Sequence, residues 1–399
     1  MKIIWNTIGT TFNSFISLFL LVVVTRLNGI ETAGVFSLAF TFSLLMQTIS
    51  NYGGRIYQVS DTVEEFSFSE YFSSRLKTSL ITILITIIYA YFMKQSNIGI
   101  LFSLVIIKII ESFSDVIYGE FQKNDKLDYI GKSLFYKSII SAIVFTIIDI
   151  LTKNIFYSIM GIVLTTMIIF VFYDLKLLKN YNKIKIIFNN KVFKKSKYVF
   201  ILSFVTLLII NAPRFIGEKG LSSEEFGYLG ILMMIPTVMA LFGQFVAQPI
   251  VINLSLYYKK KDEPNFSKLI KKSNLIIIIL GLLTCIVAVT IGPSVLKILY
   301  GISFEKYRFI FCVLIVAGTL NSITAILSNA LTILRETKIQ FYMYILVLFI
   351  EIVVLTNFYN NDLTRLIWCF VSSIILQIIL FYTIFITCKR KKLKEEKNI

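Results

Sequence analysis

Long apolar blocks separated by short polar stretches dominate the chain. Because a helix needs about 20 mainly apolar residues to cross the hydrocarbon core, the pattern predicts twelve membrane-spanning helices. No polar stretch exceeds about two dozen residues, so no soluble domain is expected. The fold class is therefore all-α integral membrane, with expected spans at 3–27, 33–54, 78–94, 98–118, 134–152, 155–174, 198–217, 226–250, 273–296, 307–332, 339–359 and 364–388.

The composition agrees with lipid as the main solvent. Hydrophobic residues make up 56% of the 399 residues and charged residues only 16%, whereas a soluble protein needs about 25% charged residues. Histidine is absent, which excludes chemistry that depends on an imidazole base or ligand. We expect no disulfide and no metal site, because the four cysteines lie far apart in apolar runs: Cys285, Cys312, Cys369 and Cys388.

The net charge of +17 is explained by topology. With the N-terminus inside, 30 of the 40 Lys and Arg residues fall on the inner side and nine on the outer side, and Lys108 lies within a span. This bias predicts that both termini are cytoplasmic. Most of the excess then contacts anionic membrane lipids, and nucleic acid is not an expected partner.

Two halves of six spans each are predicted. They comprise an N-terminal lobe at 1–175, a basic cytoplasmic loop at 176–197, a C-terminal lobe at 198–388 and a basic cytoplasmic tail at 389–399. Since six is even, both halves enter the membrane in the same orientation, which allows a parallel repeat. The similar strings FSSRLKTS (Phe72–Ser79) and FSKLIKKS (Phe266–Ser273), 194 residues apart, support such a repeat.

The fourth span carries three charges on one helical stripe. Lys108, Glu111 and Asp115 follow the spacing i, i+3 and i+7, which places them on one side of a helix. Charges in a membrane face the bundle interior or a water-filled cavity. Two interpretations remain open: a cavity wall that meets a charged substrate or carries a proton, and a Lys–Glu pair that joins two helices.

Two further cations adjoin glycine or proline. Arg55 follows Gly53-Gly54 and Arg214 follows Pro213. Ordinary roles are available for both, because Arg55 can anchor the inner end of a span and Arg214 can reach the outer surface. No phosphate-binding glycine-rich loop occurs, and the outer loops are too short for a catalytic domain. The sequence therefore favours a secondary transporter with no cofactor and no metal over an enzyme.

Four strings resemble one family of transporters. They are NTIGTTFNSFISLFLLVVVTRLNGIETAGVFSLAF (Asn6–Phe40), NYGGRIYQVSD (Asn51–Asp61), YGEFQKNDKLDYIGKS (Tyr118–Ser133) and NAPRFIGEKGLSSEEFGYLGILMMIPT (Asn211–Thr237). Together they resemble the Wzx-type polysaccharide repeat-unit flippases of the MATE-like MOP superfamily. The final third resembles that family mainly in hydropathy.

The resemblance implies two six-helix lobes around a central cavity in the cytoplasmic membrane of a bacterium. The substrate would be an undecaprenyl-pyrophosphate-linked oligosaccharide, an O-antigen or capsule repeat unit, with a polysaccharide polymerase and glycosyltransferases as possible partners. Arg55 and Arg214 match motif positions of the family and would bind the pyrophosphate. Lys108 would bind it with them; it matches no motif, but it lies at a suitable depth in the membrane. Glu111 and Asp115 would exchange H⁺ or Na⁺. The alternatives are a drug or metabolite antiporter, which needs an acidic cavity to carry cations, and a membrane polymerase or ligase.

Overall fold

The computed structural model describes residues 2–61, 65–92 and 97–395, with side chains except at 56, 60, 248, 249 and 391–395. Within these ranges the protein is helical and has no strand, which confirms the all-α prediction. Eleven described helices are long and apolar enough to cross a membrane. The remaining predicted span, the fourth, is α5 (Ile98–Lys123), which is equally long and differs by the charges of Lys108, Glu111 and Asp115. The chain is a multi-pass membrane protein.

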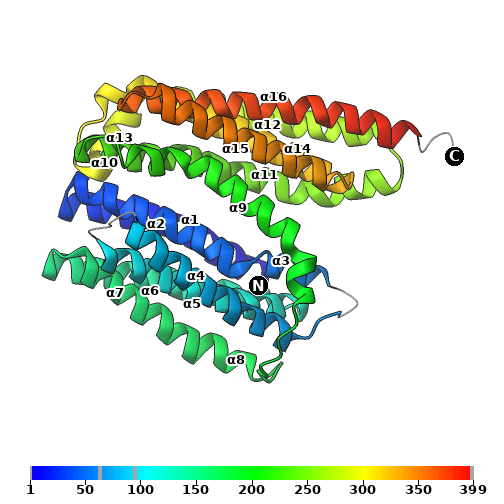
Figure 1. Cartoon of the computed structure of the whole chain (residues 1–399), viewed down its shortest axis with the longest axis horizontal. Coiled ribbons are helices and arrows are strands. Elements are labelled where there is room, and N and C mark those ends of the chain that lie inside the picture. Colours follow the sequence, from blue (N-terminus) through cyan, green and yellow to red (C-terminus); the bar gives the residue numbers. More distant parts are fainter. Residues whose placement is uncertain (1, 62–64, 93–96, 396–399) are drawn as a thin grey trace. The chain divides into compact units, whose positions relative to one another are not determined.

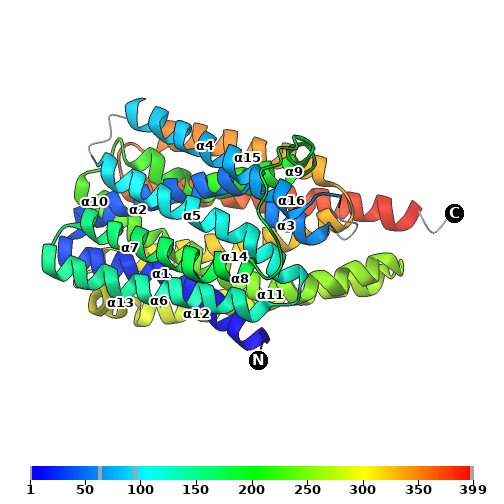
Figure 2. The same cartoon turned by 90° about the horizontal axis from the view of Figure 1, so that it is seen from below.

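The chain divides into two compact units, Met1–Leu207 and Leu208–Ile399. The division falls inside α9 (Lys191–Gly217). The predicted inter-lobe loop at 176–197 contains the short helix α8 and, contrary to the prediction, the first residues of α9. In each unit the long helices are bundled lengthwise (Figures 1 and 2). Besides α5 and α9, the first unit contains α1 (Lys2–Asn28), α2 (Ile30–Asn51), α3 (Gly54–Ser60), α4 (Phe68–Phe92), α6 (Leu127–Thr152), α7 (Ile155–Ile169), the π-helix η1 (Phe170–Leu175) and α8 (Lys176–Leu178).

Helices α1 and α6 of the first unit approach to backbone contact. A Cβ atom added to Gly9 would lie 2.0 Å from the carbonyl oxygen of Gly131, and one added to Gly131 would lie 2.1 Å from the carbonyl oxygen of Trp5. Small residues permit such close packing in membranes, where van der Waals contact replaces the hydrophobic driving force.

The loop between α3 and α4 is organised by Asp61. Its carboxylate accepts hydrogen bonds from the backbone N–H groups of Glu65 (2.9 Å) and Phe66 (3.1 Å) and from the hydroxyl of Tyr71 (2.9 Å). Burial alone would raise the pKa of Asp61, but these hydrogen bonds stabilise the charged form and hold the pKa below its ordinary value.

The second unit contains the rest of α9 and a bundle around α14 (Arg308–Ile333). Its other elements are α10 (Ser223–Leu232), α11 (Met234–Lys259), α12 (Glu263–Thr290), α13 (Gly292–Tyr300), the 3₁₀ helix η2 (Glu305–Tyr307), α15 (Thr337–Phe358) and α16 (Leu363–Glu395). The expectation of separate thiols is wrong for one pair: Cys285 of α12 and Cys312 of α14 form a disulfide, with Cα atoms 5.2 Å apart. Neighbouring helices bring the two residues together despite a sequence separation of 27.

The structure corrects the predicted ends of several spans. The second span stops at Asn51, and the segment containing Arg55 forms the separate helix α3. Helix α4 begins at Phe68, ten residues before the predicted start, so Arg75 and Lys77 lie in a helix and not in a loop. The predicted end of that span at position 94 lies outside the described residues. Lys137, which the charge tally counted with the inner-side cations, lies buried within α6.

Candidate functional site

One carboxylate bridges two guanidinium groups inside the first unit. Asp115 of α5 contacts Arg55 of α3 through Oδ1 and Nη1 at 3.3 Å, and Arg75 of α4 through Oδ2 and Nη2 at 3.7 Å. Arg55 also donates from Nη2 to Oε1 of Gln122 at 3.1 Å. We call Arg55, Arg75 and Asp115 the arginine cluster; it carries two positive charges and one negative charge.

The break between α2 and α3 makes room for Arg75. The buried guanidinium donates to the backbone carbonyls of Ser50 and Asn51 at the C-terminal end of α2, where the helix dipole favours a cation. A Cβ atom on Gly54 would lie 2.5 Å from Nη2 of Arg75. Gly53 has φ +67°, a left-handed conformation that glycine adopts without strain. Gly53-Gly54 is thus the local reason that this arginine fits.

A cavity of about 250 Å³ adjoins the arginine cluster. The side chains of Arg55 and Asp115 are 30% and 22% exposed, whereas that of Arg75 is 2% exposed. The cavity is lined by Thr48, Asn51, Gly53, Gly54, Arg55, Asp115 and Ser203. Since Arg55 and Asp115 line the cavity and Arg75 lies buried against Asp115, the cluster can receive an anion with oxygen acceptors.

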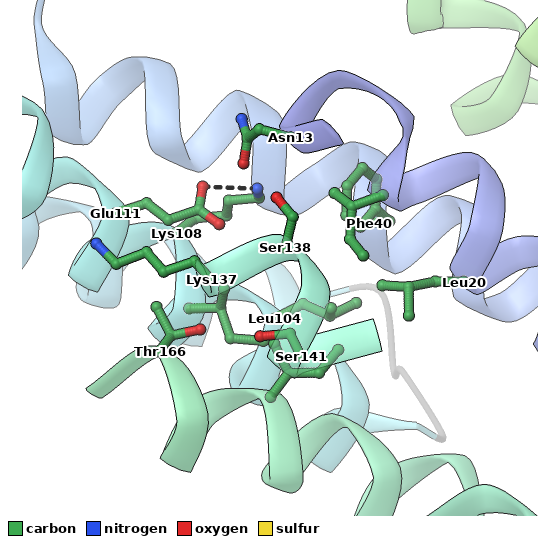
Figure 3. A pocket seen from close by; sticks show the side chains of 13 residues that line it. Asn13, Leu20, Phe40, Leu104, Lys108, Glu111, Lys137, Ser138, Ser141 and Thr166 are labelled. Atoms are coloured by element: carbon green, nitrogen blue, oxygen red, sulfur yellow. Dashed lines mark hydrogen bonds and ion pairs between the residues drawn. The ribbon is translucent and has the colours of Figure 1, made fainter. Parts of the chain in front are cut away.

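The other two charges of the α5 stripe form a pair. Nζ of Lys108 lies 2.8 Å from Oε2 of Glu111, and the same oxygen accepts from Nε2 of Gln47 on α2 at 3.0 Å. Lys108 also lies over the ring of Phe40, 5.2 Å from its centroid. The pair therefore joins α5 to α2 and, as Figure 3 shows, lies at a pocket. The Lys–Glu pair itself lies within α5, and Gln47 provides its link to the second helix; a role in meeting substrate or carrying a proton stays a prediction.

A second ion pair, which the sequence did not indicate, lies across the same pocket. Nζ of Lys137 contacts Oδ2 of Asp174 in η1 at 2.5 Å and donates to Ser114 (2.6 Å) and Tyr118 (3.0 Å). Oδ1 of Asp174 accepts from Ser133 at 2.6 Å. Lys137 and Asp174 are buried, so this is an interior pair and not part of a basic loop. The only sequence signal was a lysine followed by the apolar run of α6.

The pocket between the two pairs is small and polar on one side. It has a volume of about 40 Å³ and is lined by Asn13, Ile16, Leu20, Phe40, Leu104, Ile107, Lys108, Glu111, Lys137, Ser138, Ser141, Ile162 and Thr166. Such a space can hold a few water molecules. The interior of the first unit therefore offers a charged region beside α5 with room for water.

Arg214 belongs to the second unit and is buried. Its Nη1 donates to Oδ1 of Asn211 at 2.6 Å, and its Nη2 lies 3.5 Å from the carbonyl oxygen of Gly230. The expectation that it can reach the outer surface does not match this burial. The structure thus brings together Arg55 with Asp115 and Lys108 with Glu111, and holds Arg214 in a separate polar environment.

No known protein-family profile matches the chain. It is 26% identical over 302 residues to the capsular polysaccharide biosynthesis protein CapF of Staphylococcus aureus. The aligned region covers 74% of this chain and 76% of the relative. Among solved structures, an inward-facing multidrug-resistance MATE transporter of the MOP superfamily superposes with a TM-score of 0.76 at 12% identity, covering 100% of this chain and 99% of that one. The chain has the fold of the MATE-like MOP transporters.

Two other solved structures extend this result. The lipid II flippase MurJ, in an inward closed conformation, gives a TM-score of 0.71 at 15% identity over 98% of this chain and 91% of MurJ. A MOP superfamily transporter from Pyrococcus furiosus, described by the reverse polarity of its binding pocket, gives 0.66 at 14% identity, over 98% of this chain and 95% of that one. The fold that the sequence resemblance implied is confirmed, and these structural neighbours are described as transporters or a flippase.

Proposed function

We propose that this protein moves an undecaprenyl-pyrophosphate-linked oligosaccharide, a capsule or O-antigen repeat unit, from the inner to the outer leaflet of a bacterial cytoplasmic membrane. The relative named for capsular polysaccharide biosynthesis and the fold shared with a lipid II flippase support this proposal. Transport would proceed by alternating access between the two six-helix lobes, with both termini in the cytoplasm.

The observation that carries the proposal is the arginine cluster beside its cavity. A pyrophosphate cannot enter hydrocarbon without cationic partners, and Arg binds phosphate oxygens with paired hydrogen bonds. Arg75 is fixed by the backbone of α2, while Arg55 faces the cavity. An incoming phosphate would take the place of the Asp115 carboxylate at Arg55, an exchange of one anion for another that avoids leaving a guanidinium unpaired.

The proposal also includes Lys108, Arg214 and the carboxylates Glu111 and Asp115. Lys108 would attract the substrate further into the first unit, and Arg214 would bind it from the second. When Glu111 binds H⁺ or Na⁺, Lys108 would lose its counter-ion and become available to phosphate. Asp115 would bind H⁺ or Na⁺ while phosphate occupies the arginine cluster, and would release it and pair with Arg55 again as the substrate leaves.

Complementation of an encapsulated bacterium that lacks the gene tests this function. Arg55→Gln, Lys108→Ala and Arg214→Ala should each lower surface polysaccharide, by about 10- to 100-fold if one charge-assisted contact worth 1.5–3 kcal/mol is lost. The matched control is Arg308→Gln, which removes an exposed arginine paired with Glu305 at 2.7 Å. The variants, the control and the wild-type protein must be compared at equal protein levels in the membrane.

The location of the repeat units separates the alternatives. A flippase defect leaves single lipid-linked units on the inner leaflet, whereas a polymerase or ligase defect leaves them on the outer leaflet. Full surface polysaccharide in the deletion strain would favour the drug or metabolite antiporter and contradict our proposal.

A further inference from the structure

A carboxylate in the second unit has no partner. Glu351 lies on the face of α15 that packs against α16, together with Tyr344, Val347 and Leu355. At 1.5 Å per residue it is about 21 Å from the first residue of α15 and about 10 Å from the last, so it lies within the hydrocarbon region of this predicted span. Its side chain is 0% exposed.

Both carboxylate oxygens of Glu351 lack a hydrogen-bond partner among the described residues, and so does the amide oxygen of the buried Gln377 on α16. The ring contact of Tyr344 with Phe381, at 4.6 Å between centroids, gives the register of these antiparallel helices. Glu351 lies seven residues after Tyr344 on α15, and Gln377 lies four residues before Phe381 on α16. Because the helices are antiparallel, both steps lead toward the same end of the helix pair. The two side chains are therefore offset by only about 4–5 Å along the helix axes.

No cation compensates Glu351 in this layer. In the described part of α15 and of the helices packed against it in this unit, the lysines and arginines lie toward the helix ends. The other charged or titratable side chains of α14, α15 and α16 are Arg308, Lys338, Tyr342, Tyr344, Arg365, Cys369, Tyr382, Cys388, Lys389 and Arg390, while Cys312 is in the disulfide.

An ionised carboxylate without donors is one of the most costly groups to bury. Protonation removes the charge and turns one acceptor oxygen into a donor. The register places the amide oxygen of Gln377, itself an unpaired acceptor, within reach of such a donor. A sodium ion would need several more oxygen ligands than one carboxylate and one amide supply.

We propose that Glu351 is a proton-binding site of the second unit. The protonated carboxyl group donates to the amide oxygen of Gln377; when water reaches it, the carboxylic acid transfers that proton to water and becomes a carboxylate. Its role as a coupling group, required in addition to Glu111 and Asp115, rests on the proposed transport function. The binding of the proton does not.

Infrared spectra of the purified full-length protein in lipid at pH 7.5, compared between the wild-type protein and each variant, test proton binding without any substrate. We expect a carbonyl stretching band of a protonated carboxyl group that disappears in Glu351→Gln and shifts in Gln377→Leu. The matched control is Asp149→Asn, because Asp149 is also fully buried in a predicted span but accepts from Asn28 (2.6 Å) and Ser158 (2.9 Å). This variant should keep the band.

An unchanged band in Glu351→Gln, or its absence from the wild-type protein, would overturn the proposal. So would a band that sodium chloride removes at constant pH, because it would indicate a sodium site. Coupling is measured separately: an imposed proton gradient should stimulate flipping by the wild-type protein several-fold and leave flipping by Glu351→Gln unchanged. Failure of flipping with the band intact would contradict the transport function alone, and equal stimulation of both proteins would contradict the coupling role alone.

Discussion

The buried Lys137–Asp174 pair gives a stability prediction whose size follows from the structure. Asp174→Asn keeps the shape of the side chain but leaves the ammonium of Lys137 buried without its counter-ion at 2.5 Å. Removing one partner of a buried pair costs about 3–5 kcal/mol, which is a change of roughly 10²- to 10⁴-fold in the unfolding equilibrium. The double variant Lys137→Met/Asp174→Leu removes both charges and should recover most of that loss.

Unfolding of the purified protein in mixed micelles by increasing denaturant measures these free energies. Asp128→Asn is the control, because its ion pair with Lys132 lies on the same helix at 3.8 Å and is partly exposed. Such a pair contributes about 0–1 kcal/mol. The reasoning is refuted if Asp174→Asn unfolds within 1 kcal/mol of the wild-type protein, or if the double variant is no more stable than the single one.

Three further outcomes are expected. Gly54→Ala should displace the guanidinium of Arg75 from the arginine cluster and lower capsule export without loss of folded protein; normal export would show that this placement is unnecessary. Gly131→Ala should weaken the contact of α6 with α1 and lower the midpoint of thermal unfolding, whereas an unchanged midpoint would contradict the close approach to Trp5. The hydrogen bonds to Asp61 lower its pKa from an ordinary value of 3.8, so the stability they contribute is present above that pH and is lost as the pH falls through the lower, folded-state pKa. Asp61→Asn should therefore flatten the acid side of the stability curve, and an unaltered curve would show that Asp61 does not contribute.

The sequence predicted the helices and part of the charged interior because both depend on local patterns. The spacing of Lys108, Glu111 and Asp115 gave the stripe on α5. The break at Gly53-Gly54 was not predicted, because the expected second span ran through residue 54. Hydropathy located the long helices because burial in lipid requires apolar length. It did not locate their interruptions: the expected span 226–250 covers parts of both α10 and α11, and 273–296 covers parts of both α12 and α13.

Residues near the ends of spans were harder to interpret. Hydropathy assigned Arg75 to a loop, and the charge tally counted Lys137 with the inner-side cations. A cation near a span end has the same appearance in a sequence whether it is exposed or buried. Their partners come from other helices: Asp174 follows Lys137 by 37 residues, and the carbonyls that hold Arg75 belong to the end of α2. Such pairs depend on helix packing, which a single sequence does not reveal. The same reason explains the unpredicted Cys285–Cys312 disulfide.

The most direct test of the account is flipping by the purified protein in liposomes that contain an undecaprenyl-pyrophosphate-linked oligosaccharide. The fraction of oligosaccharide open to an externally added modifying enzyme is followed over time. We predict that the wild-type protein exposes the inner-leaflet pool and that Arg55→Gln slows this by about 10- to 100-fold, while Arg308→Gln does not. Exposure at the rate of protein-free liposomes by the folded wild-type protein, with an imposed proton or sodium gradient, would contradict the central claim.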